Sequence, residues 1–327
     1  MNILFPESVS KRKAPVNIIA DDLKLFSHEY EKKIHATTFT ELKNAYVLNN
    51  TIFKLSTLKL YNQYSLVHPL RKKDIIKNLL RLSRKQQYVD SAIWITDEYA
   101  DGYFHWLTDC LTRLIAAKPF VKSEVILLPV HLKKWAFIEQ SLAYFKLKPL
   151  FFDTAFPVKV NRLLLPSHTA PAGNYNTSII NLLREQFVGS HSIKPSRNIY
   201  ISRQKALKRK ISNEQQVISL LKTYHFEIHY FENYDFSEQV NLMKDTKCLI
   251  SLHGAGLTNM LFMREGTCVM ELRNEEDAHN NCYFSLASDL AINYYYQLNK
   301  GDSKDTHEVN ITVDTALLEK NIKHMLG

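Results

Sequence analysis

Two stretches of this 327-residue chain combine residue types that can do chemistry, and the first is a glycine-containing turn at His253–Gly256. The turn follows the apolar run Cys248–Leu252, which is typical of a buried strand, and precedes a second apolar segment near Leu257. Glycines let the backbone approach a ligand, and the N–H groups at a helix N-terminus bind anions, most often phosphate. The stretch therefore predicts a strand, a diphosphate-binding turn and a helix.

Taken alone, this turn also fits simpler interpretations. Its Gly254-x-Gly256 spacing lacks the third glycine of the dinucleotide fingerprint, because Asn259 stands there, and no Gly-Lys-Ser/Thr ending follows. An esterase oxyanion loop is excluded because the chain has no Gly-x-Ser-x-Gly elbow to supply a nucleophile. A strand-to-helix connection that merely requires glycine remains, so other residues have to support the phosphate hypothesis.

Two further polar groups are expected at the same edge of the predicted sheet. Arg203 follows the predicted strand Asn198–Ile201, and Glu271 closes the predicted strand Thr267–Leu272. Ligands of parallel sheets bind at the carboxyl ends of the strands, so both side chains are expected near the glycine turn. Arginine suits a diphosphate, and the Glu271 carboxylate suits ribose hydroxyls unless it pairs with Arg273.

A basic cluster without an acidic residue, Ser202–Lys210, follows Asn198–Ile201. It contains Lys208 and Arg209 beside Arg203. Phosphate binding and a solvated run of charges are both consistent with it.

The second stretch whose residue types can do chemistry is a helix predicted from Tyr103 to about Ala117. His105, Asp109 and Arg113 fall four residues apart on one face, while apolar residues form a separate buried stripe. The three side chains match a general base, its partner and a cation. A surface ladder, whose pairs contribute a few tenths of a kcal/mol each, is the simpler alternative.

The elements that position these residues alternate between strands and helices from Glu124 onward, which is typical of mostly parallel sheets covered on both faces. The length predicts two domains, divided at a polar connector after Gly189. We assign residues 1–190 to an N-terminal domain and 191–327 to a C-terminal domain. The last helix is expected to pack back on the first domain.

The net charge limits the classes of binding partner, and the cysteines indicate the compartment. The net charge of +9 and the pI near 9.1 favour anionic partners: a nucleotide, a nucleic acid or an acidic membrane face. Four separated cysteines indicate reduced thiols, and no signal sequence or membrane span is recognisable. We expect a cytoplasmic protein. A basic amphipathic segment, Arg71–Lys85, is either a solvated face or a peripheral contact with an anionic membrane.

Several motifs in order resemble glycosyltransferase family 61, over about Tyr103 to Tyr296. They are Tyr103–Leu107 with Asp109, Leu111 and Arg113–Leu114; Asn198–Arg203; Arg209-x-Ile211-x-Asn213-Glu214; Phe236–Gln239; His253–Asn259; Phe262; Gly266; and Val269–Leu272. Thr112 stands where relatives often carry proline, which bears on the shape of the helix.

This resemblance implies an α/β protein of the GT-B fold, with two Rossmann-like domains facing a cleft, the nucleotide sugar in the second and the acceptor largely in the first. It also implies inverting transfer without an essential metal or a cofactor. Independently, the chain lacks the Asp-x-Asp diphosphate–metal clamp. Positive side chains and a helix N-terminus must then neutralise the leaving diphosphate.

The resemblance also assigns roles. His105 and Asp109 become the base and its partner, in either order, and Arg113 an acceptor-side residue. The donor site is expected to comprise Arg203, Lys208, Arg209, His253, Gly254, Ala255, Gly256, Leu257, Thr258, Asn259 and Glu271.

The predicted function is transfer of a sugar, with UDP as the expected carrier, to a glycan or lipid-linked glycan acceptor in bacterial capsule, lipopolysaccharide or other surface polysaccharide synthesis. Two alternatives belong to other classes: a basic nucleic-acid-binding module, favoured by the charge and by Tyr294–Tyr296, and a scaffold that binds a nucleotide sugar without turnover. The sequence specifies neither the sugar, the acceptor nor the oligomeric state.

Overall fold

The computed structural model describes residues 2–65, 72–189, 194–303 and 308–327. They form two compact units, each described by itself below. Unit 1 comprises the first eight residues and Ile34–Ala172, and unit 2 comprises Val9–Lys33 and Gly173–Gly327. Both units are α/β with parallel strands, as expected.

Unit 1 is built on an eight-stranded mixed sheet in the order β6-β5-β4-β10-β7-β8-β9, with β1 also paired to β4. The strands β10, β7, β8 and β9 are mutually parallel, whereas β4, β5, β6 and β1 join antiparallel. Their bounds are β1 Asn2–Phe5, β4 Thr37–Leu48, β5 Thr51–Lys54, β6 Lys59–Leu60, β7 Gln87–Ile93, β8 Val125–Pro129, β9 Pro149–Phe152 and β10 Val158–Pro166.

The helix predicted from Tyr103 in unit 1 is divided into three parts. It begins as α3 (Tyr103–His105), widens into a π-helical turn η6 (Trp106–Cys110) and continues as α4 (Leu111–Ala117). The other α-helices described in this unit are α2 (Lys72–Leu80) and α5 (Ala136–Ala143). Arg71, the first residue of the predicted basic segment, lies outside the described residues. The core of the unit packs Trp94 and Phe152 against apolar side chains of β4, β8 and β10.

Unit 2 is built on a six-stranded sheet in the order β12-β11-β13-β14-β15-β16. The first five strands are parallel, and β16 joins antiparallel. In chain order the parallel strands read 2-1-3-4-5, a doubly wound arrangement whose switch point lies between β11 and β13. The bounds are β11 Arg197–Ile201, β12 Glu227–His229, β13 Thr246–Leu252, β14 Cys268–Asn274, β15 Asn293–Gly301 and β16 Ile311–Thr312.

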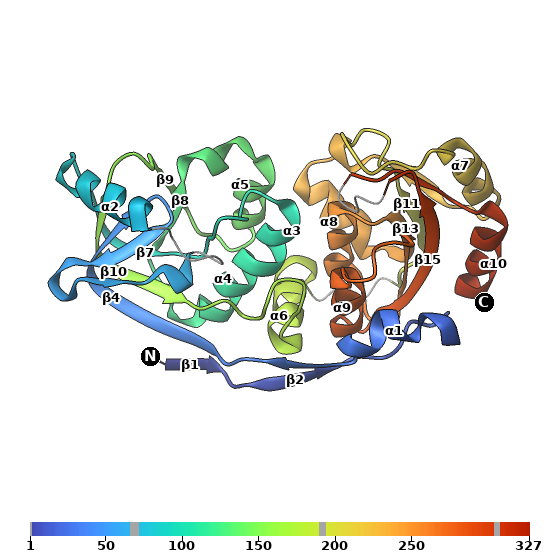
Figure 1. The fold of residues 1–327 in the computed structure, drawn as a ribbon, viewed down its shortest axis with the longest axis horizontal. Helices are drawn as coiled ribbons and strands as arrows, with labels where there is room; N and C mark the ends of the chain where they lie inside the picture. Colours follow the sequence, from blue (N-terminus) through green and yellow to red (C-terminus); the bar gives the residue numbers. More distant parts are fainter. Residues whose placement is uncertain (1, 66–71, 190–193, 304–307) are drawn as a thin grey trace. The chain divides into compact units, whose positions relative to one another are not determined.

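Helices cover both faces of this second sheet (Figure 1). One face carries α7 (Glu214–Thr223) and α10 (Thr315–Leu326), and the other carries α6 (Thr177–Val188), α8 (Phe236–Lys244), η10 (Ala255–Phe262) and α9 (Cys282–Asp289). The last helix differs from the expectation. Its residues Leu318, Ile322 and Met325 pack into the core of unit 2, so α10 belongs to this unit.

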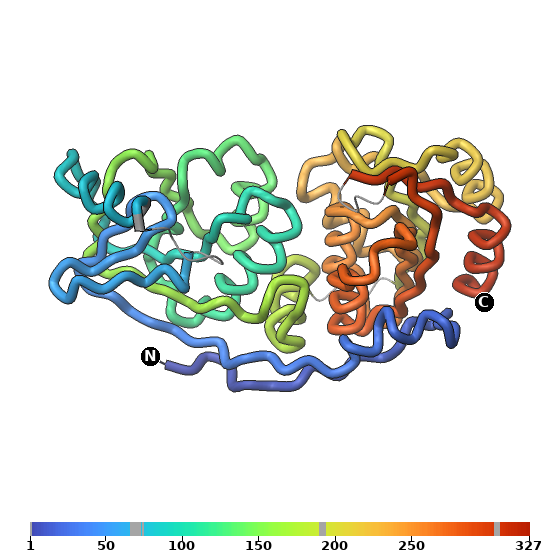
Figure 2. The backbone as a smooth tube through the Cα atoms, in the orientation of Figure 1, coloured from blue at the N-terminus to red at the C-terminus, as the bar shows by residue number. Residues whose placement is uncertain are grey.

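An N-terminal segment belongs to unit 2, although it precedes most of unit 1 in sequence. Figure 2 traces residues 9–33, in blue, beside the red and orange part of unit 2. They contain α1 (Leu23–Phe26) and parts of the ribbon β2 (Ser8–Lys11) with β3 (Glu31–Ile34). The Arg12 guanidinium anchors the segment to the rest of unit 2 by an ion pair of 3.2 Å to Asp289, while its 3.0 Å ion pair to Glu29 lies within the segment.

The unit boundary therefore differs from the division predicted at residue 190. The chain re-enters unit 2 at Gly173, and α6 belongs there. The first part of the predicted connector, residues 190–193, lies outside the described part of the chain.

The four cysteines are free, and Cys110 and Cys248 are buried. Within the described ranges, no helix combines the length and apolar character needed to cross a bilayer.

Candidate functional site

The glycine turn lies at the switch point of the unit 2 sheet, after the carboxyl end of β13 and next to that of its parallel neighbour β11. The Ser251 hydroxyl donates a 2.9 Å hydrogen bond to the Ile201 carbonyl and ties the two strand ends together. A Cβ added at Gly254 would collide with the guanidinium of Arg203, and one at Gly256 would lie 3.2 Å from the Cγ2 of Ile201. The absence of a side chain at Gly254 thus leaves the space that the Arg203 guanidinium occupies on the turn.

Backbone amides are available at this turn, but fewer than predicted. The Leu257 amide donates to the Gly254 carbonyl at 2.9 Å, and the chain continues as a 3-10 helix rather than an α-helix. Among the described residues, the amides of Gly254, Ala255 and Gly256 have no protein acceptor. These three N–H groups are the ones that can bind an anion.

The Arg203 guanidinium lies on this turn, and the charge of Arg209 is close enough to act on it. Arg203 donates from Nε to the Arg209 carbonyl at 3.1 Å and from Nη2 to the Lys208 carbonyl at 3.2 Å, which folds the basic loop over the turn. Within the part of the chain that the structure describes, neither Arg203 nor Arg209 forms an ion pair. Burial, followed by the charge of Arg209, lowers the pKa of Arg203. An anion between them would relieve both costs.

The two other predicted residues of the basic loop, Arg209 and Lys208, differ in backbone conformation and in their partners. Arg209 adopts a left-handed backbone with φ of 58°, and its Nε is buried without a partner among the described residues. Such strain at a non-glycine residue is typical of functional loops. The Lys208 ammonium instead forms an exposed ion pair with Glu308 at 3.3 Å.

His253 is held between two partners below the turn. Its Nδ1 bonds to Glu271, and its Nε2 lies 3.1 Å from the amide nitrogen of Asn280. An Asn280 amide that donates to Nε2 requires the proton on Nδ1, so this geometry selects one tautomer. The ring also makes an edge contact with Tyr283, at 5.1 Å between centroids.

The ribose-binding role expected for Glu271 does not fit this geometry. Its side chain is 0% exposed, and its two oxygens are taken by His253 and by the Tyr294 hydroxyl at 2.5 Å. Burial alone would raise the pKa of Glu271, but electrostatic attraction to His253 and to the charge of Arg273, together with these hydrogen bonds, brings the pKa below its ordinary value. Glu271 is therefore a buried anion that orients His253. Arg273, its alternative partner, donates to the Asn281 side chain and to backbone carbonyls.

The last three residues of the predicted turn, Leu257, Thr258 and Asn259, are buried in unit 2. The Asn259 amide donates to the Gly256 carbonyl at 3.0 Å and fixes the shape of the turn. Their side chains support the anion site from inside.

In unit 1, the predicted His105–Asp109 pair is in contact. His105 Nδ1 lies 2.7 Å from Asp109 Oδ2, and the Thr108 hydroxyl lies 3.3 Å from the other oxygen. Tyr99 stacks on the His105 ring with 5.1 Å between centroids. The pair spans the start of the π-helical turn, a feature that is frequent at functional sites.

A cavity of about 360 Å³ in unit 1 is lined by Asp109 together with Asp97, Tyr99, His168, Thr169 and Pro171. His105 is absent from the residues that line it. Asp109 therefore faces the cavity, and His105 supports it from the side.

A second pair of histidine and aspartate in this cavity was missed by the sequence reasoning. His168 Nε2 lies 2.9 Å from Asp97 Oδ2, and the Tyr99 amide donates to Asp97 Oδ1 at 2.9 Å. Burial would raise the pKa of Asp97, but the His168 bond, the Tyr99 amide and nearby charges lower the pKa overall. Asp97 and His168 follow the carboxyl ends of the parallel strands β7 and β10. That position was the available signal, since ligands gather there.

With this geometry defined, comparison with known proteins identifies the family. A sequence model of Glycosyltransferase 61 matches residues 103–270, just over half of the 327. The chain belongs to glycosyltransferase family 61. The match spans the His105–Asp109 pair, the basic loop and the glycine turn.

Curated relatives of this family 61 chain are EGF domain-specific O-linked N-acetylglucosamine transferases. The Drosophila melanogaster protein is 35% identical over 98 residues, which is 29% of this chain and 18% of that protein. The Gallus gallus and Mus musculus proteins are each 36% identical over 91 residues, or 26% of this chain and 17% of theirs. The matched part thus spans less than a fifth of the length of these relatives.

Arg113, expected on the acceptor side of this family 61 enzyme, is a structural residue instead. Its side chain is 0% exposed and donates to the carbonyls of Pro166 at 2.8 Å, Ile95 at 2.9 Å and Tyr64 at 2.7 Å. The π-helical turn inserts an extra residue into the helix, so Arg113 turns inward from the face of His105 and Asp109.

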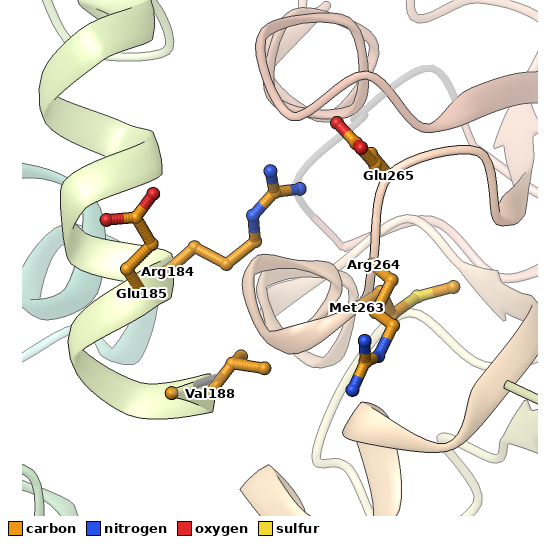
Figure 3. Close-up of a pocket in the computed structure, with 7 residues that line it drawn as sticks. Arg184, Glu185, Val188, Met263, Arg264 and Glu265 are labelled. Atoms are coloured by element: carbon orange, nitrogen blue, oxygen red, sulfur yellow. The ribbon is translucent and has the colours of Figure 1, made fainter. Parts of the chain in front are cut away.

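Two other pockets of unit 2, of about 370 and 720 Å³, share Arg264 and Glu265. Figure 3 shows the smaller one, where Arg184 of α6 reaches toward the loop at 263–265. That loop precedes β14, so both pockets lie at the amino-terminal edge of the sheet, opposite the glycine turn. They are therefore not part of the switch-point site.

No group of three or more histidine, cysteine or acidic residues within the described ranges is arranged to hold a metal ion.

Proposed function

We propose that this member of glycosyltransferase family 61 moves a sugar from a nucleotide-sugar donor, a UDP-sugar, to a hydroxyl group of a glycan acceptor. The observation that carries the proposal is the Arg203 guanidinium on the glycine turn, beside three amides without a protein acceptor among the described residues, with the charge of Arg209 nearby and no ion pair to either arginine there. A diphosphate matches this set of donors in charge and in hydrogen bonding.

The reaction is proposed as one direct, inverting displacement. The acceptor oxygen bonds to the anomeric carbon as the bond from that carbon to the diphosphate oxygen breaks, and the acceptor proton passes to a base. Negative charge develops on the leaving diphosphate. Arg203, Arg209 and the amides of Gly254–Gly256 would stabilise it without a metal ion.

Asp109 is our candidate for the base, with His105 as its orienting partner. Asp109 faces a cavity of sufficient size for a sugar ring, and the 2.7 Å bond from His105 fixes its carboxylate. The proton would move from the acceptor hydroxyl to Asp109 as the new bond forms.

Both units are required in this mechanism, because the donor residues lie in unit 2 and the base in unit 1. We therefore infer a GT-B arrangement, in which the two units face one cleft. The parallel strands in both units and the 2-1-3-4-5 order in unit 2 match the Rossmann-like units of that fold.

A surface polysaccharide or its lipid-linked precursor is the acceptor class that we propose, and a cytoplasmic membrane surface is the proposed location. The relatives are named as specific for EGF domains, which are proteins. A protein hydroxyl group is therefore the competing acceptor. Helix α2 supports membrane contact, because Ile76, Leu79 and Leu80 are exposed beside Lys73 and Lys77. Nucleic-acid binding loses one supporting feature, since Tyr294–Tyr296 are buried in β15 and cannot stack on bases.

The experiment that tests catalysis compares the parent with Asp109→Asn, using UDP release from UDP-sugars in the presence of candidate acceptors. Loss of the base should lower the rate by about 10² to 10⁴ while UDP binding is retained. Rates equal to the parent in both Asp109→Asn and His105→Ala would exclude this pair as the base. Donor binding by the parent without any UDP release would favour a non-catalytic scaffold.

A further inference from the structure

The pair formed by His168 and Asp97 has no role in the mechanism described so far. The His168 side chain is 27% exposed, and the Asp97 side chain is 2% exposed. Both line the cavity that contains Asp109. His168 uses Nε2 for Asp97, and its Nδ1 has no partner among the described residues.

We propose that this cavity is a binding site for a neutral hexopyranoside, in which Nδ1 of His168 accepts a hydrogen bond from one sugar hydroxyl while Asp109 faces another. The inference rests on the proposed function, because it assigns the cavity to the sugar ring of the acceptor. His168 is a positioning residue, and the proton is still taken by Asp109.

The orientation of His168 determines what its free nitrogen can do. Asp97 accepts a hydrogen bond from Nε2–H, and the Tyr99 amide donates to the other carboxylate oxygen. A carboxylate on one ring nitrogen fixes the tautomer of the imidazole, as in other histidine–carboxylate pairs. The Nδ1 of neutral His168 is then a hydrogen-bond acceptor, which matches a hydroxyl donor.

The rest of the lining selects a neutral polyhydroxyl ligand over an anion. Among the described residues that line the cavity, the carboxylates of Asp97 and Asp109 are accompanied by His35 and His168, and no lysine or arginine is present to bind a phosphate or carboxylate group. Tyr99 and Pro171 provide apolar surface for the C–H face of a sugar ring. A volume of about 360 Å³ lies within the range of ligand pockets.

Two isosteric substitutions separate hydroxyl binding from a structural role. In His168→Gln the side-chain amide replaces Nε2 and keeps the bond to Asp97, but the position of Nδ1 is empty. In His168→Asn the amide replaces Nδ1 and loses the bond to Asp97. A hydroxyl-binding role therefore predicts that the asparagine variant keeps more sugar binding than the glutamine variant.

The test uses saturation-transfer NMR on the full chain with the methyl glycosides of glucose, galactose, mannose and N-acetylglucosamine. We expect at least one to bind the parent, with binding about three- to tenfold weaker in His168→Gln, as for one lost hydrogen bond. His168→Asn should bind more tightly than His168→Gln. His131→Asn, at an exposed histidine outside the cavity, should bind like the parent.

Three results would overturn the inference: no binding of any of these glycosides to the parent, parent-like binding by His168→Gln, or binding by His168→Asn that is no better than that of His168→Gln. The stabilisation by UDP, measured on the same variants, reports on unit 2 and should stay unchanged. If UDP does not stabilise the parent, the proposed function is contradicted. The glycoside result would still decide the role of His168.

Discussion

Gly254 is the residue on which the proposed diphosphate site depends most directly. A methyl group there would push the Arg203 guanidinium off the turn, because the two already lie in contact. We expect Gly254→Ala to weaken UDP binding about tenfold to a hundredfold, the range for a lost hydrogen bond to a charged group. Gly256→Ala should have a smaller effect, since only a methyl group of Ile201 has to yield. Calorimetric titration with UDP measures both, and parent-like affinity in Gly254→Ala would move the site elsewhere.

His105 gives the reaction a predicted pH dependence. Burial would lower the pKa of His105, but the bond to Asp109 and the charges of Asp109, Asp97 and Asp101 raise the pKa above its ordinary value. An imidazolium would weaken Asp109 as a base, so kcat should rise with pH through a midpoint above about 6.5.

Asp101 offers a mild test of this dependence, because it is exposed and does not line the cavity. Asp101→Asn removes one of the charges that raise the pKa of His105. The midpoint of the kcat profile should therefore move to lower pH, with an unchanged plateau and a larger shift at low salt. A midpoint that stays in place or rises would contradict the role of His105.

For single residues, the spacing in the sequence predicts which side chains are in contact, but it does not predict which side chains are buried. The four-residue spacing brings His105 to Asp109, and the strand ends bring Arg203 to Gly254. The same reasoning could not show that Arg113 and Glu271 are 0% exposed, because their environments are formed by distant residues such as Tyr64 and Tyr294. It also missed His168, whose partner Asp97 lies 71 residues away in the chain.

Among the elements, the strands of the second half were the most predictable. Expected strands at 198–201, 248–252 and 267–272 correspond to β11, β13 and β14, because buried parallel strands are short, continuous apolar runs. The π-helical turn was not predictable, since its wider hydrogen bonding depends on tertiary packing. That single turn places Asp109 at the cavity and Arg113 in the core.

Helix α2 carries the prediction about membranes. Ile76, Leu79 and Leu80 are 58%, 45% and 73% exposed, with Lys73 and Lys77 beside them on the helix. We expect the protein to co-sediment with vesicles that contain phosphatidylglycerol more than with phosphatidylcholine alone, because anionic lipids attract the lysines. Leu80→Glu should weaken this binding about tenfold, which corresponds to the loss of one buried leucine.

The matched control for α2 is Leu317→Glu, which changes a leucine of α10 that is 39% exposed. It should sediment like the parent. Equal sedimentation of Leu80→Glu and the parent, or no preference for anionic vesicles, would show that α2 is a solvated face.

For the whole molecule, the α/β class follows from the alternation of strands and helices in the sequence. The same pattern does not show which segments of the chain belong to which unit. Residues 9–33 belong to unit 2 through buried polar contacts, such as Arg12 to Asp289, that join residues 277 positions apart. Local periodicity carries no information about such pairs. The N-terminal segment was therefore assigned to the wrong unit from sequence alone.

Part of the net charge of +9 can be assigned to a particular site in the molecule. Arg203 and Arg209 concentrate positive charge at the switch point of a doubly wound sheet, where nucleotides bind in such folds. The central claim is that this site binds the diphosphate of a sugar donor.

The most direct test is a thermal-shift titration of the parent and Arg203→Gln with UDP, GDP, CMP and uridine. A ligand bound only by the folded state raises the unfolding temperature, so UDP should stabilise the parent and uridine should not. Arg203→Gln should lose most of that stabilisation, because it removes the guanidinium that we propose to contact the diphosphate. Stabilisation by none of the nucleotides, or equal stabilisation by UDP in the parent and in Arg203→Gln, would contradict the diphosphate site.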